Sequence, residues 1–209
     1  MLRPRLLDGV SILLAGALAG VDGRRSLGDA VREACAGLGA RVCDCELSGE
    51  VPGGLEDGAI EDAVGRALAG GASVELLVVD SASVFARAFQ RDGDARDALR
   101  ECLDSSWNAT RVVANAAFMP DARGGRIVYL APPADAGEHA DAARAGLENL
   151  ARTLSIEWAR HGITLVAIAP GAGSGGVDVA GEVASLTAYL ASPAGAYFSG
   201  CLLDLRGVQ

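Results

Sequence analysis

The amino-acid sequence contains no lysine, so every one of its 18 Lys-or-Arg side chains is an arginine. An arginine keeps its proton near neutral pH, and acid–base chemistry that depends on a lysine ammonium group is therefore excluded. Basic side chains are also outnumbered, because the 209-residue chain has a formal net charge of −9. Nucleic acids and anionic membranes require clustered basic side chains, so neither is an expected partner.

Cysteine is scarce and unevenly placed, with five residues at positions 35, 43, 45, 102 and 201. An odd number argues against a complete disulfide framework, and Cys43 and Cys45 have neither the spacing of a metal site nor a second pair. We expect free, mostly buried thiols in a reducing compartment, and no metal centre.

Long apolar runs are absent as well, and no segment is suited to crossing a membrane. Residues 1–19 imitate a secretory signal that ends in Ala17-Leu18-Ala19. Asp8 and Gly9 interrupt the start of the apolar run, and residues 10–15 fit a buried strand equally well. We therefore expect a cytoplasmic protein.

What is present is a regular alternation of short apolar runs and segments with helical periodicity. The chain is half apolar and long enough to bury a sizeable core. Strands are expected at 10–15, 40–46, 76–79, 126–130, 164–169 and 201–205, and helices at 26–38, 55–69, 95–119, 142–161 and 181–191. This alternation predicts an α/β fold of the Rossmann type, a doubly wound parallel sheet, in one domain over residues 1–209.

Residues 140–147 read ADAARAGL, within a stretch from Gly124 to Gly171. This stretch and residues 181–207 resemble the short-chain dehydrogenase/reductase (SDR) family, whose motif Y-A-A-A-K-A-G-L aligns on 140–147 without a gap. The resemblance implies that Ala140 stands at the position of the catalytic tyrosine and Arg144 at that of the catalytic lysine. The family's catalytic serine belongs to a run that matches residues 129–132, where Ala131 and Pro132 carry no hydroxyl group.

These substitutions imply that no catalytic residue of the family is intact. In the family, the tyrosine hydroxyl exchanges a proton with the substrate oxygen, and a methyl group at position 140 has no such proton. Arg144 keeps a positive charge, although its planar guanidinium differs in shape from an ammonium group. The candidates for a rebuilt acid or base are His139 and Tyr129. One position on a helix is about 100° of rotation, so His139 should face away from the old site.

The SDR resemblance also implies a dinucleotide site, which the sequence keeps only in part. Gly16 and Gly20 match the first two glycines of the family's loop, and Asp22 replaces the third, where its charge would repel phosphates. Glu46 ends the second strand, so any bound cofactor should be NAD rather than NADP. The candidate cofactor-binding residues are Gly16, Gly20, Glu46, Asp80, Pro170 and Gly171. The alternative is that the two glycines form only a tight turn and no cofactor binds.

Two regions are short by comparison with the family. Residues 172–180 replace the substrate-binding loop and helix pair, and residues 47–54 replace further secondary structure. By contrast, helices 95–119 and 142–161 and strand 201–205 match the elements that build SDR oligomers.

This pattern predicts a catalytically silent subunit that assembles with a paralogous active SDR, or with itself, through those three elements. One alternative is an NAD(P)-dependent oxidoreductase, or a lyase or isomerase of this fold, with rebuilt catalytic residues. Another is a regulator that senses NAD(H) without turnover.

Overall fold

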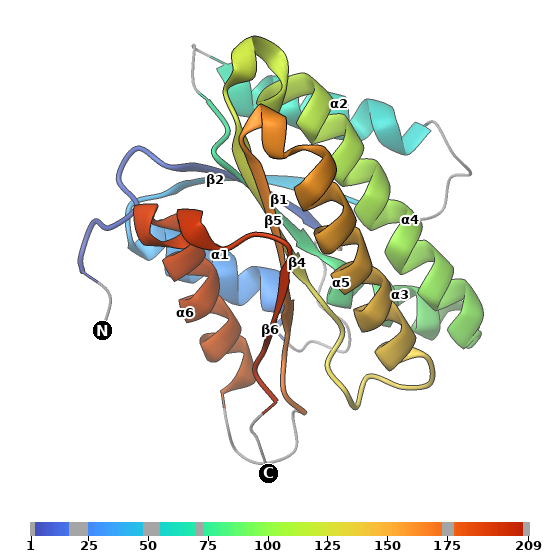
Figure 1. Cartoon of the computed structure of the whole chain (residues 1–209). Helices are drawn as coiled ribbons and strands as arrows, with labels where there is room; N and C mark the ends of the chain where they lie inside the picture. Colours follow the sequence, from blue (N-terminus) through green and yellow to red (C-terminus); the bar gives the residue numbers. More distant parts are fainter. Residues whose placement is uncertain (1–2, 17–24, 48–54, 70–72, 173–177, 207–209) are drawn as a thin grey trace.

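The computed structural model describes residues 3–16, 25–47, 55–69, 73–172 and 178–206. Its centre is one parallel sheet of six strands in the order β2-β1-β3-β4-β5-β6 (Figure 1). The strands are β1 Ser11–Gly16, β2 Arg41–Glu46, β3 Leu76–Asp80, β4 Gly125–Leu130, β5 Ile163–Ala169 and β6 Cys201–Asp204. All six expected strands are present, and the predicted doubly wound α/β fold is confirmed.

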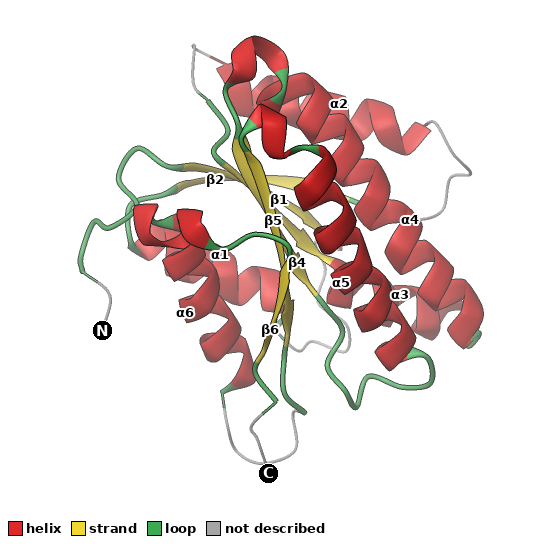
Figure 2. Ribbon diagram, in the orientation of Figure 1, coloured by secondary structure: helices red, strands yellow, loops and turns green. Residues whose placement is uncertain are grey.

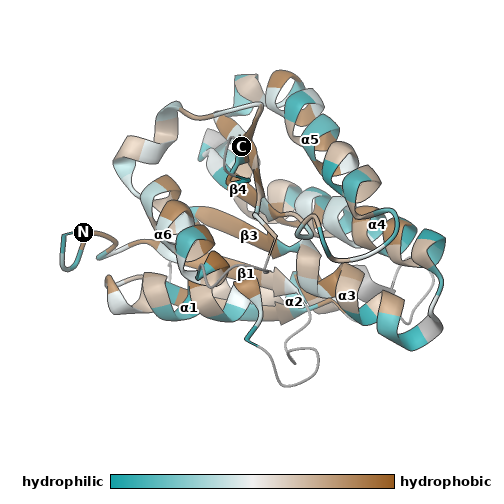
Figure 3. Ribbon diagram, turned by 90° about the horizontal axis from the view of Figure 1, so that it is seen from below, coloured by the Kyte–Doolittle hydropathy of each residue, from teal (hydrophilic) through white to brown (hydrophobic). Residues whose placement is uncertain are grey.

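Helices cover both faces of the sheet (Figure 2). On one face lie α1 Leu27–Gly37 and α6 Val179–Ala191; on the other lie α2 Leu55–Leu68, α3 Ser81–Asp92, α4 Ala95–Val113 and α5 Ala140–Glu157. Successive strand residues point to opposite faces, so each strand contributes to two apolar cores. Figure 3 shows this layering, with mostly hydrophobic strands between helices whose ribbons also carry hydrophilic residues.

The start of α1 has the geometry that its sequence indicates. Ser26 is the N-cap residue, and its hydroxyl accepts a hydrogen bond from the backbone N–H of Asp29. The Asp29 carboxylate in turn accepts from the backbone N–H of Ser26, which completes a capping box. The expected beginning of this helix is therefore confirmed.

Helix α3 was not expected, because no helix is predicted between the strand at 76–79 and the helix at 95–119. The structure begins a helix at Ser81, directly after β3, with Asp80 as its N-cap. Val84, Phe85 and Ala88 form the buried face of this helix, and Gly93 ends it in the left-handed conformation at φ 66°. The signals of a helix were present, namely an aspartate before it and a glycine after it.

Two other helices differ from their expected bounds by more than two residues. The helix expected over 95–119 ends as an α-helix at Val113 and continues as a π-helical turn, Ala114–Phe118. The helix expected over 142–161 begins earlier, at Ala140, and ends at Glu157, before a 3₁₀ turn. A helix end is decided by backbone hydrogen bonds that side-chain periodicity does not report.

Within the described ranges, β2 is an outer strand of the sheet. The shortened segment after it, residues 48–54, lies outside the described residues. None of the helices in the described part of the chain is long and apolar enough to cross a bilayer. Nor do three or more His, Cys, Asp or Glu side chains come together there in a way that could hold a metal ion.

Candidate functional site

Ligands of open parallel sheets bind at the carboxyl ends of the strands, and most candidate cofactor residues lie at this edge. Gly16, the last residue of β1, is the register partner of Glu46 on one side and of Asp80 on the other. The structure thus brings three of the candidates into one row. Pro170 and Gly171 follow β5, on the far side of β4. Gly20 lies outside the described residues, as does Asp22.

Asp80 lies where two helix N-termini converge. Its side chain is almost fully buried, with 2% of the residue exposed. Oδ2 accepts a hydrogen bond of 2.8 Å from the backbone N–H of Gly28 in the first turn of α1. Oδ1 accepts one of 3.0 Å from the backbone N–H of Ser83 in the first turn of α3. One carboxylate therefore satisfies free N–H groups of both helices.

Two glycines are required by this close approach. A Cβ atom on Gly28 would lie 2.7 Å from Oδ2 of Asp80, and one on Gly16 would lie 2.8 Å from the Cβ of Asp80. The small cavity between Gly16, Ser26, Gly28 and Asp80 has a volume of about 10 Å³, which is roughly the space of one water molecule. Gly16 and Gly28 thus leave the space that the Asp80 side chain occupies.

Burial raises the pKa of Asp80, while hydrogen bonds from Ser83, Gly28 and Ser26 act in the opposite direction. No arginine of the described residues forms an ion pair with this carboxylate; its hydrogen-bond donors are neutral groups.

A dinucleotide of the NAD type would need the N-terminus of α1 for its pyrophosphate. At this helix end the Gly28 N–H already donates to Asp80, and a phosphate would lie beside a buried carboxyl group. The described residues therefore fit that cofactor poorly. Asp80 lies at the carboxyl edge of the sheet, as its place after the third strand indicates, whereas the binding of its carboxylate to α1 is evident only in the structure.

Glu46, the residue expected to select NAD, is exposed at the end of β2. Its carboxylate lies 3.6 Å from the guanidinium of Arg87 on α3, and 56% of the side chain is accessible. Pro170 is buried, and Gly171 follows it, where a Cβ would lie 3.4 Å from the carbonyl oxygen of Leu205. A role for these three residues in cofactor binding stays a prediction.

Ala140 and Arg144, which the SDR resemblance aligns with the family's tyrosine and lysine, lie one turn apart on α5, and both are buried. Ala140 is 1% exposed and Arg144 is 3% exposed. Nη1 of Arg144 donates to the carbonyl oxygen of Pro132 at 3.4 Å, and Nη2 lies 3.9 Å from Oδ1 of Asp204. Arg144 thus connects the loop after β4 to the end of β6.

The charge of Arg144 is poorly compensated. Nη2 is buried and has no hydrogen-bond partner among the described residues. Burial and, secondarily, the charge of Arg206 lower the pKa of Arg144. Asp204 is shared between Arg144 and Arg206, because Arg206 donates to both of its oxygens at 2.9 Å. These bonds hold the pKa of the Asp204 carboxyl group at about 2. A desolvated N–H without a partner costs about 1–3 kcal/mol.

Replacing Arg144 with methionine is therefore expected to leave the free energy of unfolding unchanged or to raise it by about 1 kcal/mol. Methionine fills the volume with a flexible apolar chain and removes the unpaired donor. The matched control is Arg152→Met on the same helix, whose exposed guanidinium pairs with Glu148 at 2.6 Å and should contribute under about 1 kcal/mol. Urea unfolding measures the free energy of unfolding of both variants. A loss of several kcal/mol at position 144 would contradict this expectation.

The polar groups of the two replacement candidates, Tyr129 and His139, have other contacts. The hydroxyl of Tyr129 is buried among α4 side chains and forms a 2.8 Å hydrogen bond with Thr110, and burial raises its pKa. His139 precedes α5 at φ 66° and lies 3.8 Å from Glu138. It lines a surface pocket with Asp94 at the turn between α3 and α4.

No protein-family model matches the chain. Solved structures match over almost its whole length. A hydroxysteroid dehydrogenase from Escherichia coli has a TM-score of 0.72 at 18% identity, and the match covers 98% of this chain and 99% of the other. A short chain dehydrogenase from Mycobacterium smegmatis has a TM-score of 0.72 at 20% identity, with coverages of 98% and 95%.

A third match has the highest identity of the three. It is the citronellol catabolism dehydrogenase of Pseudomonas aeruginosa PAO1, with a TM-score of 0.70 at 26% identity and coverages of 100% and 98%. These likenesses, together with the six-stranded parallel sheet, show that the chain has the Rossmann-type fold of short-chain dehydrogenases.

Proposed function

We propose that this chain is a catalytically silent member of the SDR superfamily, and that it acts as a structural or regulatory subunit beside an active SDR partner. The observation that carries the proposal is the state of the two positions on α5. Ala140 offers no proton to a substrate, and the guanidinium of Arg144 is buried against Pro132 and Asp204. A general acid must lie within hydrogen-bond reach of the atom that it protonates.

The surroundings of Asp80 support the same proposal from the cofactor side. An SDR reaction transfers hydride to or from a bound nicotinamide cofactor. In this chain the carboxylate of Asp80 already binds the N-terminus of α1, where the pyrophosphate of that cofactor would bind. The chain should therefore bind NAD(H) more weakly than an active partner does.

The surfaces that the SDR resemblance assigns to assembly are available in this structure. On the α4–α5 side, Trp107 is 38% exposed and stacks on Trp158, with ring centroids 6.4 Å apart. Ile156, near the end of α5, is 79% exposed. In the described part of the chain, β6 pairs only with β5, so its other edge is open to a partner. Exposed aromatic and aliphatic groups of this kind favour an interface.

Native mass spectrometry of the chain, purified gently from its own host, tests the proposal. We expect a mixed dimer or tetramer with a second SDR chain and fewer bound nucleotides than subunits. Trp107→Glu should weaken the assembly, whereas Asp62→Arg, on the exposed side of α2, should leave it intact. A homo-oligomer that carries one dinucleotide in every chain would overturn the proposal.

A further inference from the structure

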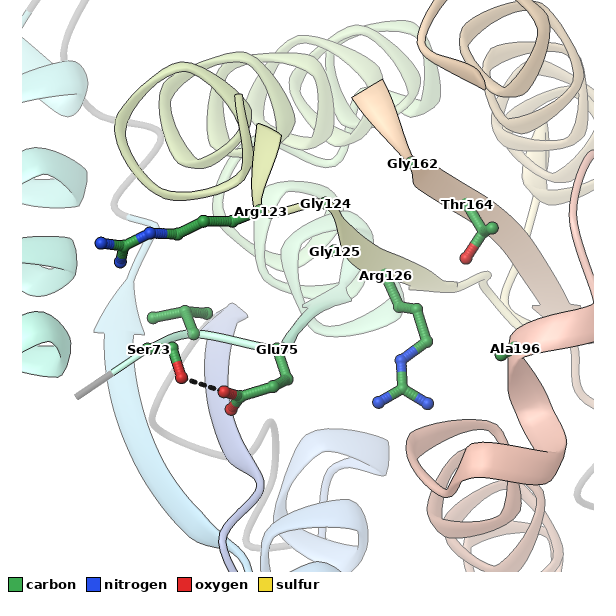
Figure 4. Close-up of a pocket in the computed structure, with 10 residues that line it drawn as sticks. Ser73, Glu75, Arg123, Gly124, Gly125, Arg126, Gly162, Thr164 and Ala196 are labelled. Carbon is green, nitrogen blue, oxygen red and sulfur yellow. Dashed lines mark hydrogen bonds between the residues drawn. The ribbon is translucent and has the colours of Figure 1, made fainter. Parts of the chain in front are cut away.

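A pocket separate from those at Asp80 and His139 lies at the opposite edge of the sheet from Asp80, where β3, β4 and β5 begin (Figure 4). Its volume is about 660 Å³, within the range of small-molecule sites. The residues that line it are Ser73, Val74, Glu75, Arg123, Gly124, Gly125, Arg126, Gly162, Thr164 and Ala196. None of these residues belongs to the candidate site at the carboxyl edge.

Arg126 supplies a half-buried cation to this pocket. Its Nη1 donates to the carbonyl oxygens of Leu190 at 2.9 Å and Ser192 at 2.7 Å, at the end of α6. These two bonds fix the guanidinium in place and use only one of its three nitrogens. Among the described residues, no carboxylate forms an ion pair with Arg126, so its remaining N–H groups can bind a ligand.

Glu75 supplies the opposite charge and is also fixed in place. Its Oε2 accepts a 2.6 Å hydrogen bond from the backbone N–H of Ser11 at the start of β1, and Oε1 accepts from the hydroxyl of Ser73. In the part of the chain that the structure describes, Glu75 has no cationic partner within ion-pair distance. Each carboxylate oxygen can accept a further bond.

The two charges influence each other without touching. Glu75 raises the pKa of Arg126, which burial lowers more strongly. Each side chain is bound to a different element, Glu75 to the start of β1 and Arg126 to the end of α6. The fold thus holds a carboxylate and a guanidinium apart across one pocket, as Figure 4 shows.

Thr164 adds a polar group beside the cation. It is the register partner of Arg126 on the neighbouring strand, so both side chains extend from the same face of the sheet. Figure 4 shows its hydroxyl group directed into the pocket. Val74 and Ala196 contribute small apolar surfaces to the wall.

We propose that this pocket binds a small zwitterion of the α-amino-acid class. Arg126 and Thr164 bind its carboxylate, and Glu75 binds its ammonium group. A simple anion would meet the charge of Glu75, and a simple cation would meet that of Arg126, so only a ligand with both charges satisfies both groups. The proposal does not depend on the function proposed above.

Calorimetric titration at constant ionic strength with alanine, propionate and ethylamine tests it, because these ligands share a carbon skeleton of similar size and differ in charge. We expect saturable binding of alanine and at least about tenfold weaker binding of the other two, which corresponds to about 1.4 kcal/mol. No saturable binding of alanine, or equal affinities for alanine and propionate, would overturn the proposal.

Two variants show whether the named groups bind the ligand. Glu75→Gln keeps an acceptor for the Ser11 N–H and should reduce the advantage of alanine over propionate to about twofold or less. Thr164→Val has nearly the same shape and should weaken the binding of alanine and propionate alike. Arg96→Gln, in the separate pocket beside His139, is the matched control and should change neither affinity. Unchanged selectivity in folded Glu75→Gln would overturn the assignment.

Discussion

Replacing Asp80 with serine is expected to convert the N-terminus of α1 into a binding site for an external anion. Serine is a good N-cap residue, so its hydroxyl can still accept from the Ser83 N–H and preserve the start of α3. It is too short to reach the Gly28 N–H as the carboxylate does at 2.8 Å. The variant therefore leaves the Gly28 N–H at the N-terminus of α1 without its acceptor, beside the two glycines that accommodated Asp80.

The expected size of the effect follows from this unpaired N–H group. In a buffer without multivalent anions, Asp80→Ser should lose about 1–3 kcal/mol of the free energy of unfolding. Added phosphate should restore stability, by about 2.7 kcal/mol when its concentration is a hundredfold above its dissociation constant. The native chain should show no such gain at α1, because its own carboxylate holds the position.

Urea unfolding with and without phosphate measures the gain in the free energy of unfolding. A shift of the Gly28 amide resonance on addition of phosphate shows that the anion binds at α1. Asp178→Ser is the matched control, since Asp178 is the N-cap of α6 and accepts from the Gly181 N–H at 2.9 Å on the exposed surface. It should lose under about 1 kcal/mol and gain no specific phosphate dependence. An equal response of Asp80→Ser and the native chain to phosphate would contradict the expectation.

Gly28→Ala is expected to lower the free energy of unfolding by about 2–4 kcal/mol, more than any other methyl group added to α1. Its Cβ would lie 2.7 Å from Oδ2 of Asp80, so either the helix or the carboxylate must move. The cost combines overpacking, about 1–3 kcal/mol, with the loss of the hydrogen bond between Gly28 and Asp80. Gly37→Ala is the control on the same helix, because nothing lies within 4 Å of its new methyl group, and it should be neutral or gain about 0.5–1 kcal/mol.

The two predictions are coupled, and a double-mutant cycle measures the coupling. In the Asp80→Ser background the oxygen that collides with the new methyl group is gone, so Gly28→Ala should cost about 1–2 kcal/mol less than in the native chain. Chemical denaturation of the native chain, both single variants and the double variant gives this difference. The same cost for Gly28→Ala in both backgrounds would show that Asp80 does not determine the need for glycine.

Local patterns were enough to predict the sheet, because each buried strand is a short apolar run that turn-forming residues separate from the next helix. The N-cap Ser26 and its partner Asp29 are three residues apart, so their capping box is also visible in the sequence. Helix α3 was missed although the signals of its two ends are local, namely Asp80 as its N-cap and Gly93 after it.

The chemistry at the candidate sites could not be predicted in the same way. The hydrogen bond from Gly28 to Asp80 joins residues 52 positions apart, and those of Glu75 with Ser11 and of Arg126 with Leu190 each join residues 64 positions apart. No periodicity or motif reports contacts over such separations. Only the packing of the elements shows whether a charged side chain faces a ligand or binds another part of the chain.

The sequence by itself determined the α/β alternation, the absence of lysine and the identities of Ala140 and Arg144, which the SDR resemblance aligns with the catalytic tyrosine and lysine. These properties depend on residue type and local order, which folding does not change. The tertiary structure alone decided that Asp80 binds the N-terminus of α1, that Arg144 is buried with an unpaired N–H group, and that Glu75 and Arg126 remain apart across one pocket. Each of these depends on distances between remote residues, and such distances exist only after the sheet and its helices have packed.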